Sequence, residues 1–473
     1  MIRAPLDAEP IVVSNPAAAP RLQEPPPRLA ELLAAVRQGR PLPGPDPAVV
    51  DHFAAIAGEA DWNDVAEAVV AAELVDRGFR FHHVRGDEAC RRDELLLGDY
   101  CLVCAAELAT RLGRSELDAE FAGAAMAAAT GADYDAHLRR AVELAVSAPA
   151  APMATPGASS TVDGVDSATV LRVIEDRLRE VISADPPAVG RPMDSMLSAG
   201  GKRLRPQLAY LASTLGPGHD PARAATLASV IEFIHNATLV HDDLVDESPL
   251  RRGIPAVHVA YGAQAAVRVG DYYFGRAASL LASLTSPRAT RLIVVAVALV
   301  CEAQIEEFRS RGMEHLDEAR YLEIVEGKTA ALFSGACAAG AALAGAGDDV
   351  VQAMAEYGQS MGIAFQMVDD VLDFSPTSGK TLVQDLRQSV GLPLVYAAED
   401  PEVREALTDL LRANEFDAES ALRLVRESGA LERTMERAHG FRDRALAALS
   451  DVPAGPARDR LHEIAVFAVT RTS

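Results

Sequence analysis

The sequence lacks any uninterrupted apolar run long enough to cross a membrane. About 18 residues are needed, and the longest candidate, from Leu292 to Val300, is about half that length. The first 27 residues are rich in Pro and Ala and have no apolar core of the signal-peptide type. Cations are also scarce, since 45 Lys and Arg stand against 68 Asp and Glu, for a formal net charge of −23. We therefore expect a cytoplasmic protein with no nucleic-acid partner, because such a partner requires clustered Lys and Arg.

Cysteines and aromatic residues are few. The five cysteines are Cys90, Cys101, Cys104, Cys301 and Cys337. Cys101 and Cys104 form one C-x-x-C inside an apolar helical run, without a second pair or a nearby His at zinc-finger spacing, so buried small side chains are expected there. An odd count without a disulfide framework indicates a reducing compartment. Aromatics at 5%, with abundant Ala and Leu, favour helix over sheet.

Helical periodicity dominates the 473 residues, and strand alternation is convincing nowhere, so the expected fold class is all-α in both halves of the chain. Residues 1–27 are expected to be disordered, 28–146 to form a smaller helical domain and 166–473 to form a larger one. Residues 147–165 are dominated by Pro, Ala, Gly and Ser and lose apolar periodicity. This segment predicts an interdomain linker.

A faint internal repeat relates the two helical regions. Residues 72–83 can be aligned without a gap with residues 231–242, and residues 95–101 with residues 267–273. The second copy has an Asp-Asp pair where the first has His-Val, and the loop before the Gly-Asp-Tyr segment is shorter in the first copy. Any two alanine-rich helices could align this well, so chance and duplication both stay open.

Two acidic clusters close apolar helical runs. They consist of Asp242, Asp243 and Asp246, and of Asp369, Asp370 and Asp373. Asp242 and Asp246 stand one turn apart on one face, where like charges repel by a few tenths of a kcal/mol. A cation must compensate them if they are buried. Carboxylates in two clusters suit Mg²⁺, which also takes the oxygens of substrate phosphates.

Cationic and glycine-rich motifs accompany these clusters. They are Gly200-Gly201-Lys202-Arg203-Leu204-Arg205-Pro206, Arg251-Arg252-Gly253, the run from Glu326 to Phe333, and Ser378-Gly379-Lys380-Thr381. Lys and Arg near glycine-rich turns suit phosphate groups. Together with metals they can stabilise the charge that develops on a leaving diphosphate. The sequence has no P-loop, dinucleotide fingerprint or Ser-His-Asp arrangement.

From about residue 165 to the end, the chain resembles the all-trans, head-to-tail isoprenyl diphosphate synthases. A single D-D-x-x-D is a weak signal, but two clusters with G-G-K-R-L-R-P before the first and K-T-A-x-L-F between them are specific to that family. The C-terminal run from Glu463 to Arg471 also resembles the last helix of the family. The resemblance implies an isoprenoid-synthase helical bundle and a prenyltransferase that joins isopentenyl diphosphate to an allylic diphosphate.

The resemblance also implies a role for each matching residue. Asp242, Asp246 and Asp369 would hold about three Mg²⁺ on the allylic diphosphate, supported by Asp243, Asp370 and Asp373. The same diphosphate would be contacted by Arg251, Lys328 and Lys380. The diphosphate of isopentenyl diphosphate would be bound by Gly201, Lys202, Arg205, His235 and Arg252. Thr329 and Gln366 would lie beside the reacting carbons, and Phe365 would lie against the isopentenyl tail.

One loop departs from the family pattern. After the second cluster the family usually continues as G-x-D-L-x-x-G, one further residue, then T-L-P. Here the run from Gln384 to Pro393 is one residue short and lacks both the glycine after Leu386 and a lysine. That loop closes over the diphosphates in the family, so we expect activity with altered lid closure or turnover.

Product length in this family depends on the helix that leads into the first cluster. The positions four and five residues before the first Asp are Thr238 and Ala237, both small, which predicts an open tunnel and a product longer than farnesyl. The A-T-L-x-H-D-D form also resembles synthases that make medium or long chains for quinone tails. An aromatic residue from the next helix (Tyr272, Tyr273 or Phe274) could block the tunnel, so a geranylgeranyl product stays open.

Residues 28–146 resemble the smaller, aspartate-poor subunit of heteromeric family members, since they keep Leu97-Gly98-Asp99-Tyr100 without the acidic cluster. An unrelated helical extension is the alternative. A homodimer is expected, with transient membrane contact for product release. A class I terpene cyclase would replace the second aspartate cluster with an Asn/Ser/Glu pattern, and a regulatory subunit would lack the aspartates, so both alternatives are disfavoured.

Overall fold

A computed structural model describes residues 47–57, 62–82, 92–147, 167–309, 317–374, 391–412 and 417–471. Nearly all of these residues are helical, which confirms the all-α expectation. Several sequence predictions lie outside the described residues: the disordered N-terminus, residues 148–165 of the linker, Cys90, Lys380 and the loop up to residue 390. The division into domains at residues 146 and 166 stays a prediction.

The described residues form two compact units. The first lies within Met1–Gly157, Leu171–Arg203 and Ala225–Val294, and the second within Ala158–Val170, Leu204–Ala224 and Val295–Ser473. The first unit therefore combines the N-terminal helices with helices of the region that carries the first aspartate cluster.

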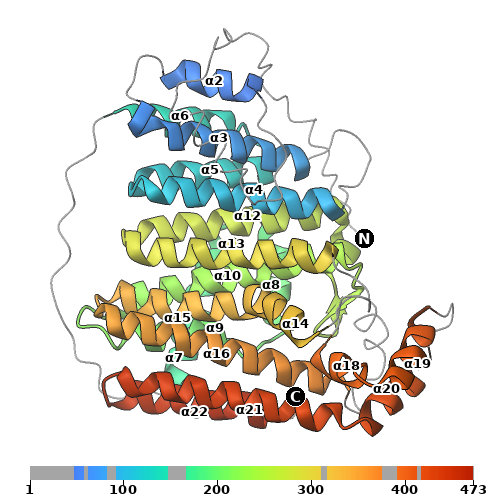
Figure 1. Ribbon diagram of the computed structural model, residues 1–473. Helices are drawn as coiled ribbons and strands as arrows, with labels where there is room; N and C mark the ends of the chain where they lie inside the picture. The colour runs from blue at the N-terminus through green and yellow to red at the C-terminus, as the bar shows by residue number, and fades with distance from the viewer. Residues whose placement is uncertain are drawn as a thin grey trace. The chain divides into compact units, whose positions relative to one another are not determined.

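The helices of the N-terminal region are α2 (Pro47–Ala57), α3 (Trp62–His82), α4 (Arg92–Arg111), α5 (Ser115–Thr130) and α6 (Asp135–Val146). They are followed by α7 (Ser167–Ala184), α8 (Pro187–Ser198), α10 (Pro221–Val245), α11 (Val257–Tyr261), α12 (Ala263–Ser283) and α13 (Pro287–Arg309). Helix α3 packs along α4, and α5 packs chiefly along α12 (Figure 1). The last contact is close because Gly275 faces α5, where a Cβ would lie 2.8 Å from the Cβ of Ala125.

Two short strands interrupt the helical order after α10. Strand β1 (Leu250–Arg251) pairs antiparallel with β2 (Ile254–Pro255), with Arg251 opposite Ile254. The two turn residues, Arg252 and Gly253, have φ of 51° and 80°. Two successive positive φ angles are typical of a two-residue hairpin turn whose twist matches the strands. The hairpin was not expected from the sequence, and it fixes two adjacent arginines next to the first cluster.

The helices of the second unit pack around α16. They are α9 (Leu204–Ser213), α14 (Glu318–Val325), the π-helix η3 (Glu326–Ala330), α15 (Ala331–Leu343), α16 (Asp348–Leu372), α18 (Leu392–Ala397), α19 (Pro401–Arg412), α20 (Ala418–Glu427), α21 (Ala430–Ala448), the 3₁₀ turn η4 (Leu449–Asp451) and α22 (Pro456–Thr470). Helix α16 contacts α15 on one side and α21 on another (Figure 1). Close approach again uses glycine, since a Cβ at Gly358 would lie 2.5 Å from the carbonyl oxygen of Phe333.

Two further expectations can be compared with the described residues. Cys101 and Cys104 are buried with free thiols in α4, as expected for small core side chains. Within the described part of the chain, no helix is both long and apolar enough to cross a bilayer.

Candidate active site

The first aspartate cluster lies at the C-terminal end of α10, in the first unit. Asp242 and Asp246 are half-buried and one turn apart, and the backbone N–H of Asp246 donates to the carbonyl of Asp242 at 2.8 Å. Asp243 is only 1% exposed. The C-terminal end of a helix carries a partial negative charge, so carboxylates there are unfavourable without a cation. The end of α10 is thus a place where a cation is stabilising.

Arg251 of the hairpin supplies a cation to the buried member of the cluster. Its Nε donates to both carboxylate oxygens of Asp243, at 2.9 and 3.2 Å, and its Nη2 also pairs with Oδ1. Burial raises the pKa of Asp243 above its usual range, and the charge and hydrogen bond of Arg251 partly offset that rise. Arg251, predicted to contact the allylic diphosphate, is therefore placed at the cluster and held by Asp243.

The turn before α9 gathers a second set of cations within the first unit. Gly201 has φ of 137°, and a Cβ there would lie 2.9 Å from Nη1 of Arg252 and 3.0 Å from Nη1 of Arg203. Arg252 also pairs with the carbonyl of Gly200. Burial and the charges of Arg203 and Arg251 lower the pKa of Arg252, against the opposing charge of Glu232. The guanidinium groups of Arg203 and Arg252 thus meet at Gly201, where the resemblance predicts that Gly201 and Arg252 bind a diphosphate.

Arg203 was not singled out from the sequence, although it lies between two predicted phosphate ligands. It is 5% exposed, its Nε donates to Glu175 at 2.9 Å and its Nη1 donates to Glu232 at 2.7 Å. Its Nη2 donates to the carbonyl of Leu197 at 2.6 Å. These bonds fix the turn, whereas Lys202 is exposed. Only these tertiary contacts distinguish the structural Arg203 from its exposed neighbour Lys202.

The helix before the first cluster carries the predicted product-length positions. Ala237 is fully buried and Thr238 is half-buried, with its hydroxyl donating to the carbonyl of His235 at 2.7 Å. His235, predicted to bind isopentenyl diphosphate, is also half-buried on this helix.

The three aromatic residues of α12 that could block a tunnel each contact a side chain of the first unit. The Tyr272 hydroxyl donates to Asp185 at 3.0 Å. The ring of Tyr273 packs 5.1 Å from that of Phe233, and the ring of Phe274 packs 5.9 Å from that of His241. Phe233 stands one turn before Ala237, so Tyr273 approaches the helix on the Ala237 side.

The second aspartate cluster closes α16, in the second unit. Its central carboxylate, Asp370, accepts hydrogen bonds from the Tyr321 hydroxyl at 2.7 Å, from Gln366 at 2.9 Å and from the backbone N–H of Leu392 at 3.0 Å. Burial raises the pKa of Asp370, and these three hydrogen bonds partly offset the rise. Asp369 keeps 37% of its side chain exposed, and Asp373 is exposed. The two clusters thus share one plan: a buried carboxylate held by its neighbours, beside carboxylates that reach solvent.

Lys328 and Thr329 lie on the π-helix η3, where one extra residue widens the turn. Such bulges are rare and are frequently found at functional sites. Lys328 pairs with Glu307 of α13. The Thr329 hydroxyl donates to Gln366 Oε1 at 2.9 Å, and Gln366 in turn donates to Asp370. The structure thus joins the predicted residues Thr329, Gln366 and Asp370 in one hydrogen-bonded chain.

The remaining predicted residues of the second unit surround two aromatic rings. The Arg205 guanidinium lies 4.2 Å from the ring centre of Phe333, and Phe333 lies 5.5 Å from Phe365. On the other side, the Arg471 guanidinium lies 3.8 Å from the Phe365 ring and 2.7 Å from Asp369 Oδ1. Arg471 was not predicted as a site residue. It comes from the end of the chain, and its place beside Asp369 depends on the packing of α22.

The donor set fits a hard divalent cation. Asp242 and Asp246 in the first unit, and Asp369 in the second, offer carboxylate oxygens that reach solvent at the negative ends of helices. Mg²⁺ prefers one or two carboxylates, water and substrate phosphate oxygens to a closed protein cage. Asp243 and Asp370 are buried, so their carboxylates are less accessible to a hydrated Mg²⁺ than those that reach solvent, and they suit a supporting place better than a ligand's.

Comparison with known proteins places these motifs in one family. The polyprenyl synthetase family matches residues 186–427, slightly more than half of the chain. Heptaprenyl diphosphate synthase component 2 of Geobacillus stearothermophilus is 32% identical over 302 residues, which cover 63% of this chain and 94% of the relative. Octaprenyl diphosphate synthase of Escherichia coli (strain K12) is 34% identical over 284 residues, covering 58% and 88%.

Solved structures agree with this assignment. A polyprenyl synthase from Caulobacter crescentus CB15, complexed with calcium and isoprenyl diphosphate, is 37% identical with a TM-score of 0.58, covering 65% of this chain and 94% of that chain. A decaprenyl diphosphate synthase from Rhodobacter capsulatus is 34% identical with a TM-score of 0.60, covering 65% and 97%. The family match begins at residue 186, so α2 to α6 precede it. With both aspartate clusters, the cationic turn and the helical fold in place, the chain belongs to the polyprenyl synthetase family.

Proposed function

We propose that this protein is a Mg²⁺-dependent prenyltransferase that condenses isopentenyl diphosphate with an allylic diphosphate to make an all-trans polyprenyl diphosphate of medium to long chain. The observation that carries the proposal is the shared plan of the two clusters. In each, a buried aspartate is fixed by neighbours at the end of a 25-residue helix, and further aspartates reach solvent beside it. The heptaprenyl, octaprenyl and decaprenyl synthases among the relatives support a medium or long product.

The residues of the chain bind and orient the two diphosphates. Gly201, Arg252 and Lys202 form a cationic turn suited to the diphosphate of isopentenyl diphosphate, with Arg205 and His235 as further ligands. Arg251, Lys328 and Lys380 are assigned to the allylic diphosphate. Arg251 and Lys328 are held at rest by Asp243 and Glu307, so their charges stay positioned before substrate arrives.

Bound Mg²⁺ would supply charge neutralisation of the departing diphosphate. Asp242, Asp246 and Asp369 are the residues that would hold it. The allylic C–O bond ionises, the isopentenyl double bond attacks the resulting cation, and the released pyrophosphate takes the proton that is lost. The Thr329 hydroxyl donates to Gln366, and these two side chains would lie beside the reacting carbons, where their oxygen atoms would stabilise a developing carbocation. The Phe365 ring would lie against the isopentenyl tail.

Incubating the full-length protein with Mg²⁺, farnesyl diphosphate and radiolabelled isopentenyl diphosphate tests the proposal. Elongated diphosphates are expected, and chromatography of the dephosphorylated products gives their length. A cyclised hydrocarbon would instead identify a class I terpene cyclase, and a complete lack of conversion would favour a regulatory subunit. A twenty-carbon product would identify a geranylgeranyl diphosphate synthase. That alternative has support from Tyr273, whose ring packs against Phe233 on the helix that carries the product-length positions.

For residues 28–146 we propose the role of a fused partner that lacks the acidic cluster and helps to line the product tunnel. The packing of α5 along α12 supports this proposal, since α12 carries the aromatic residues nearest the product-length positions. Gly275→Leu in the full-length protein is expected to push α5 away from α12 and to change the product distribution. Gly440→Leu, on α21 where a Cβ meets nothing within 4 Å, is the control. An unchanged distribution in folded Gly275→Leu would favour an unrelated extension.

Three further assignments belong to the same proposal. A cytoplasmic location is proposed from the cysteines, whose odd number and spacing form no disulfide framework. Transient contact with a membrane would accept the long apolar product. The family resemblance predicts a homodimer, whereas an internal partner predicts a single chain of 50.0 kDa, and light scattering of the purified protein separates the two.

A further inference from the structure

Equivalent positions of the internal repeat make equivalent contacts in the first unit. In the alignment of the two copies, His82 corresponds to His241, and Leu95 corresponds to Val267. His82 Nε2 lies 3.0 Å from the carbonyl oxygen of Leu95, and His241 Nε2 lies 3.1 Å from that of Val267. Each histidine is therefore anchored in the same way to the neighbouring helix of its own copy.

The glycines of the repeat are also used alike. A Cβ at Gly98 would lie 2.1 Å from His82 Nε2, and a Cβ at Gly270 would lie 2.0 Å from His241 Nε2. Real Cβ atoms do not approach this closely, so both positions require glycine for the same reason. Each glycine lets its own histidine lie directly against the helix backbone.

Between the copies the contacts are crossed. His82 Nδ1 lies 2.7 Å from Asp271 Oδ1, while His241 Nδ1 lies 2.9 Å from both carboxylate oxygens of Asp99. Asp99 and Asp271 are themselves equivalent in the alignment. The two imidazole rings meet edge to face, with centres 5.7 Å apart. All four residues are buried.

This reciprocity is the mark of a twofold interface, in which residue i of one copy contacts residue j of the other and j contacts i. A chance similarity between two alanine-rich helices gives no reason for both crossed pairs to form. The duplication reading of the repeat is therefore favoured.

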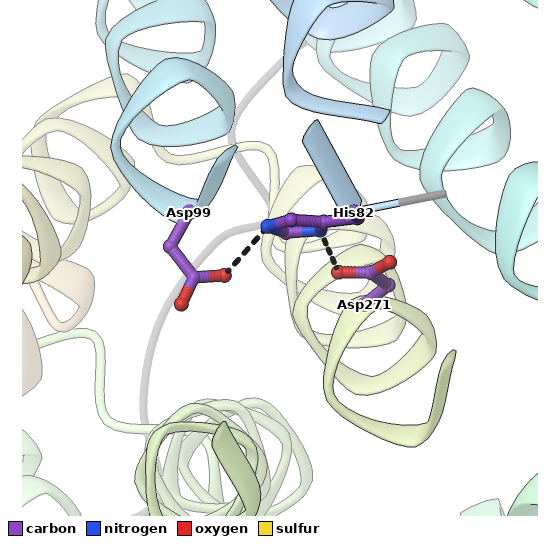
Figure 2. A group of neighbouring side chains, drawn as sticks. All are labelled: His82, Asp99 and Asp271. Atoms are coloured by element: carbon purple, nitrogen blue, oxygen red, sulfur yellow. Dashed lines mark hydrogen bonds and ion pairs between the residues drawn. The ribbon is translucent and has the colours of Figure 1, made fainter. Parts of the chain in front are cut away.

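The crossed pairs engage both nitrogens of His82 in hydrogen bonds, which favours ionic contacts over a metal site although the three side chains lie close together. In Figure 2 the two carboxylates lie on opposite sides of the His82 ring, Asp271 at one nitrogen and Asp99 at the other, with Nε2 3.6 Å from Asp99. Both ring nitrogens already have hydrogen-bond partners, since Nδ1 faces Asp271 and Nε2 also faces the Leu95 carbonyl. A histidine whose two nitrogens both face oxygens donates from both, as an imidazolium. Two imidazolium and two carboxylate groups balance each other.

The same set of contacts is self-complementary. Helices α10 and α12 carry one histidine and one aspartate of the interface, His241 and Asp271, so a second copy of these helices would offer the same pair. Here Asp99 and His82 occupy those positions, and α5 covers α12 at Gly275. The face of α10 and α12 that a second chain would need is thus covered by the N-terminal helices of the same chain.

We infer that α3 and α4 are an internal partner for α10 and α12, related to them by an approximate twofold axis and held by the crossed His–Asp pairs, and that together with α5 they occupy the face where a second copy would otherwise pack. This inference deepens the partner role proposed for residues 28–146 and rests on it.

A disulfide in the full-length chain tests where the partner comes from. The Met126 Cγ lies 3.1 Å from the Cβ position at Gly275, close to the distance of about 3 Å between a Cβ and the far sulfur of a disulfide. In Met126→Cys with Gly275→Cys, oxidation is expected to link the two positions within one chain, and the mass stays that of one 50.0 kDa chain. A product of twice that mass, or no link in a folded protein, would overturn the inference. If the double variant fails to fold, adding Ala125→Gly gives the new side chain room.

Hydrogen exchange tests the reciprocity without new cysteines. His82→Asn and His241→Asn are each expected to raise exchange roughly tenfold or more in both α4 and α12, because each pair holds both copies together. His137→Asn, at a half-exposed histidine that pairs with Glu120 within the N-terminal region, is the control and should change neither helix. An effect confined to the histidine's own copy would contradict the twofold clasp. Prenyl transfer is assayed on the same samples: a link that forms in an inactive protein counts against the proposed reaction, not against the internal partner.

Discussion

The two copies of the repeat differ in the residues that come after their shared histidine. The described part of α3 runs to His82, after which the sequence continues with His83 and Val84, whereas α10 runs past His241 to Val245 and carries Asp242 and Asp243 on its last turn. Both copies keep the histidine, the glycine beneath it and the aspartate that pairs across the interface. Packing and chemistry are thus separable in this fold: the buried pairs hold the copies together, while the carboxylates that follow His241 give the second copy, called the competent copy below, its proposed metal ligands.

The two copies also differ in where their arginines are held. The competent copy is followed by the β1–β2 hairpin, which brings Arg251 onto Asp243 and Arg252 to the turn at Gly201. The first copy has Arg77 on the equivalent helix, but that arginine pairs with Glu73 one turn earlier, inside its own helix. An arginine held within its own helix stabilises that helix and is not directed toward a substrate.

The largest effect is expected from removing a half-buried carboxylate of the competent copy. Asp242→Ala should lower turnover about a thousandfold or more. Mg²⁺ would lose one of its protein ligands, so the negative charge that develops on the departing diphosphate would be stabilised less well. The matched control is His83→Ala, at the corresponding position of the first copy, which should leave turnover unchanged. Steady-state assays with radiolabelled isopentenyl diphosphate measure both. Near-normal turnover in Asp242→Ala would end the metal role assigned to the first cluster.

The ionic clasp, meaning the two crossed His–Asp pairs, should weaken in alkaline solution. Burial alone would lower the pKa of His241, but the charge and hydrogen bond of Asp99, the charge of Asp271 and the Val267 carbonyl outweigh it and raise the pKa to about 9. His82 faces the same carboxylates, and its pKa is also raised. A histidine whose folded pKa lies above its unfolded value of 6.5 stabilises the fold fully below pH 6.5. That stabilisation is lost as the pH rises through about 9.

Urea unfolding measured between about pH 7.5 and 9.5 checks this loss, which should be about 2 kcal/mol for His241 within this window, because about 1.5 units of its raised pKa lie above pH 7.5 and each is worth about 1.4 kcal/mol. The window avoids Asp118, whose pKa burial raises to about 7. His241→Gln should be less stable at neutral pH and should show a flatter pH dependence. A pH-independent stability of the parent protein across this window would contradict the ionic clasp.

Alanine at the two repeat glycines should have similar, moderate effects. Gly98→Ala and Gly270→Ala each place a Cβ about 2 Å from a buried imidazole nitrogen, so each should lower the free energy of unfolding by about 1–3 kcal/mol. The control Gly440→Ala, in α21 with nothing within 4 Å, should be neutral or stabilising by up to about 1 kcal/mol. Markedly unequal losses at Gly98 and Gly270 would break the equivalence of the two copies.

The smallest change in rate, with a clear change in product, is expected from Thr238→Phe. Thr238 is half-buried, so an aromatic ring can be accommodated there more readily than at the fully buried Ala237. The ring should shorten the product by one or more five-carbon units. Chromatography of dephosphorylated products measures the shift, and Thr238→Val is the control of similar size. An unchanged product in Thr238→Phe would show that the tail does not pass this face of α10.

Much of the fold and the site could be predicted from the chain alone. Helical periodicity, the two aspartate clusters and the small residues before the first of them are local patterns, so they are visible without a fold. The sequence did not separate members of a cluster: Asp242 and Asp243 are adjacent, yet one is half-buried and the other is 1% exposed and held by Arg251.

Several functional features left little local signal. The hairpin turns on Arg252-Gly253, whereas two-residue turns of this kind favour Asn-Gly or Asp-Gly. Tyr321 and Arg471 reach the second cluster from 49 and 102 positions away along the chain (370 − 321 and 471 − 369). No residue pattern marked η3, because a π-helix differs from an α-helix by one residue in its hydrogen bonding.

The sequence by itself determined the helical class, the family resemblance and the residues available for diphosphate chemistry, because helix periodicity and motif spacing are properties of neighbouring residues. It also showed an internal repeat whose first copy lacks the acidic cluster, but it did not decide whether the repeat arose by duplication or by chance similarity. Only the tertiary structure brought His82 to Asp271 and His241 to Asp99, and buried all four. The reason is physical: a crossed ion pair between helices 142 or 189 residues apart is stable only when packing removes it from water, and spacing along the chain carries no record of that.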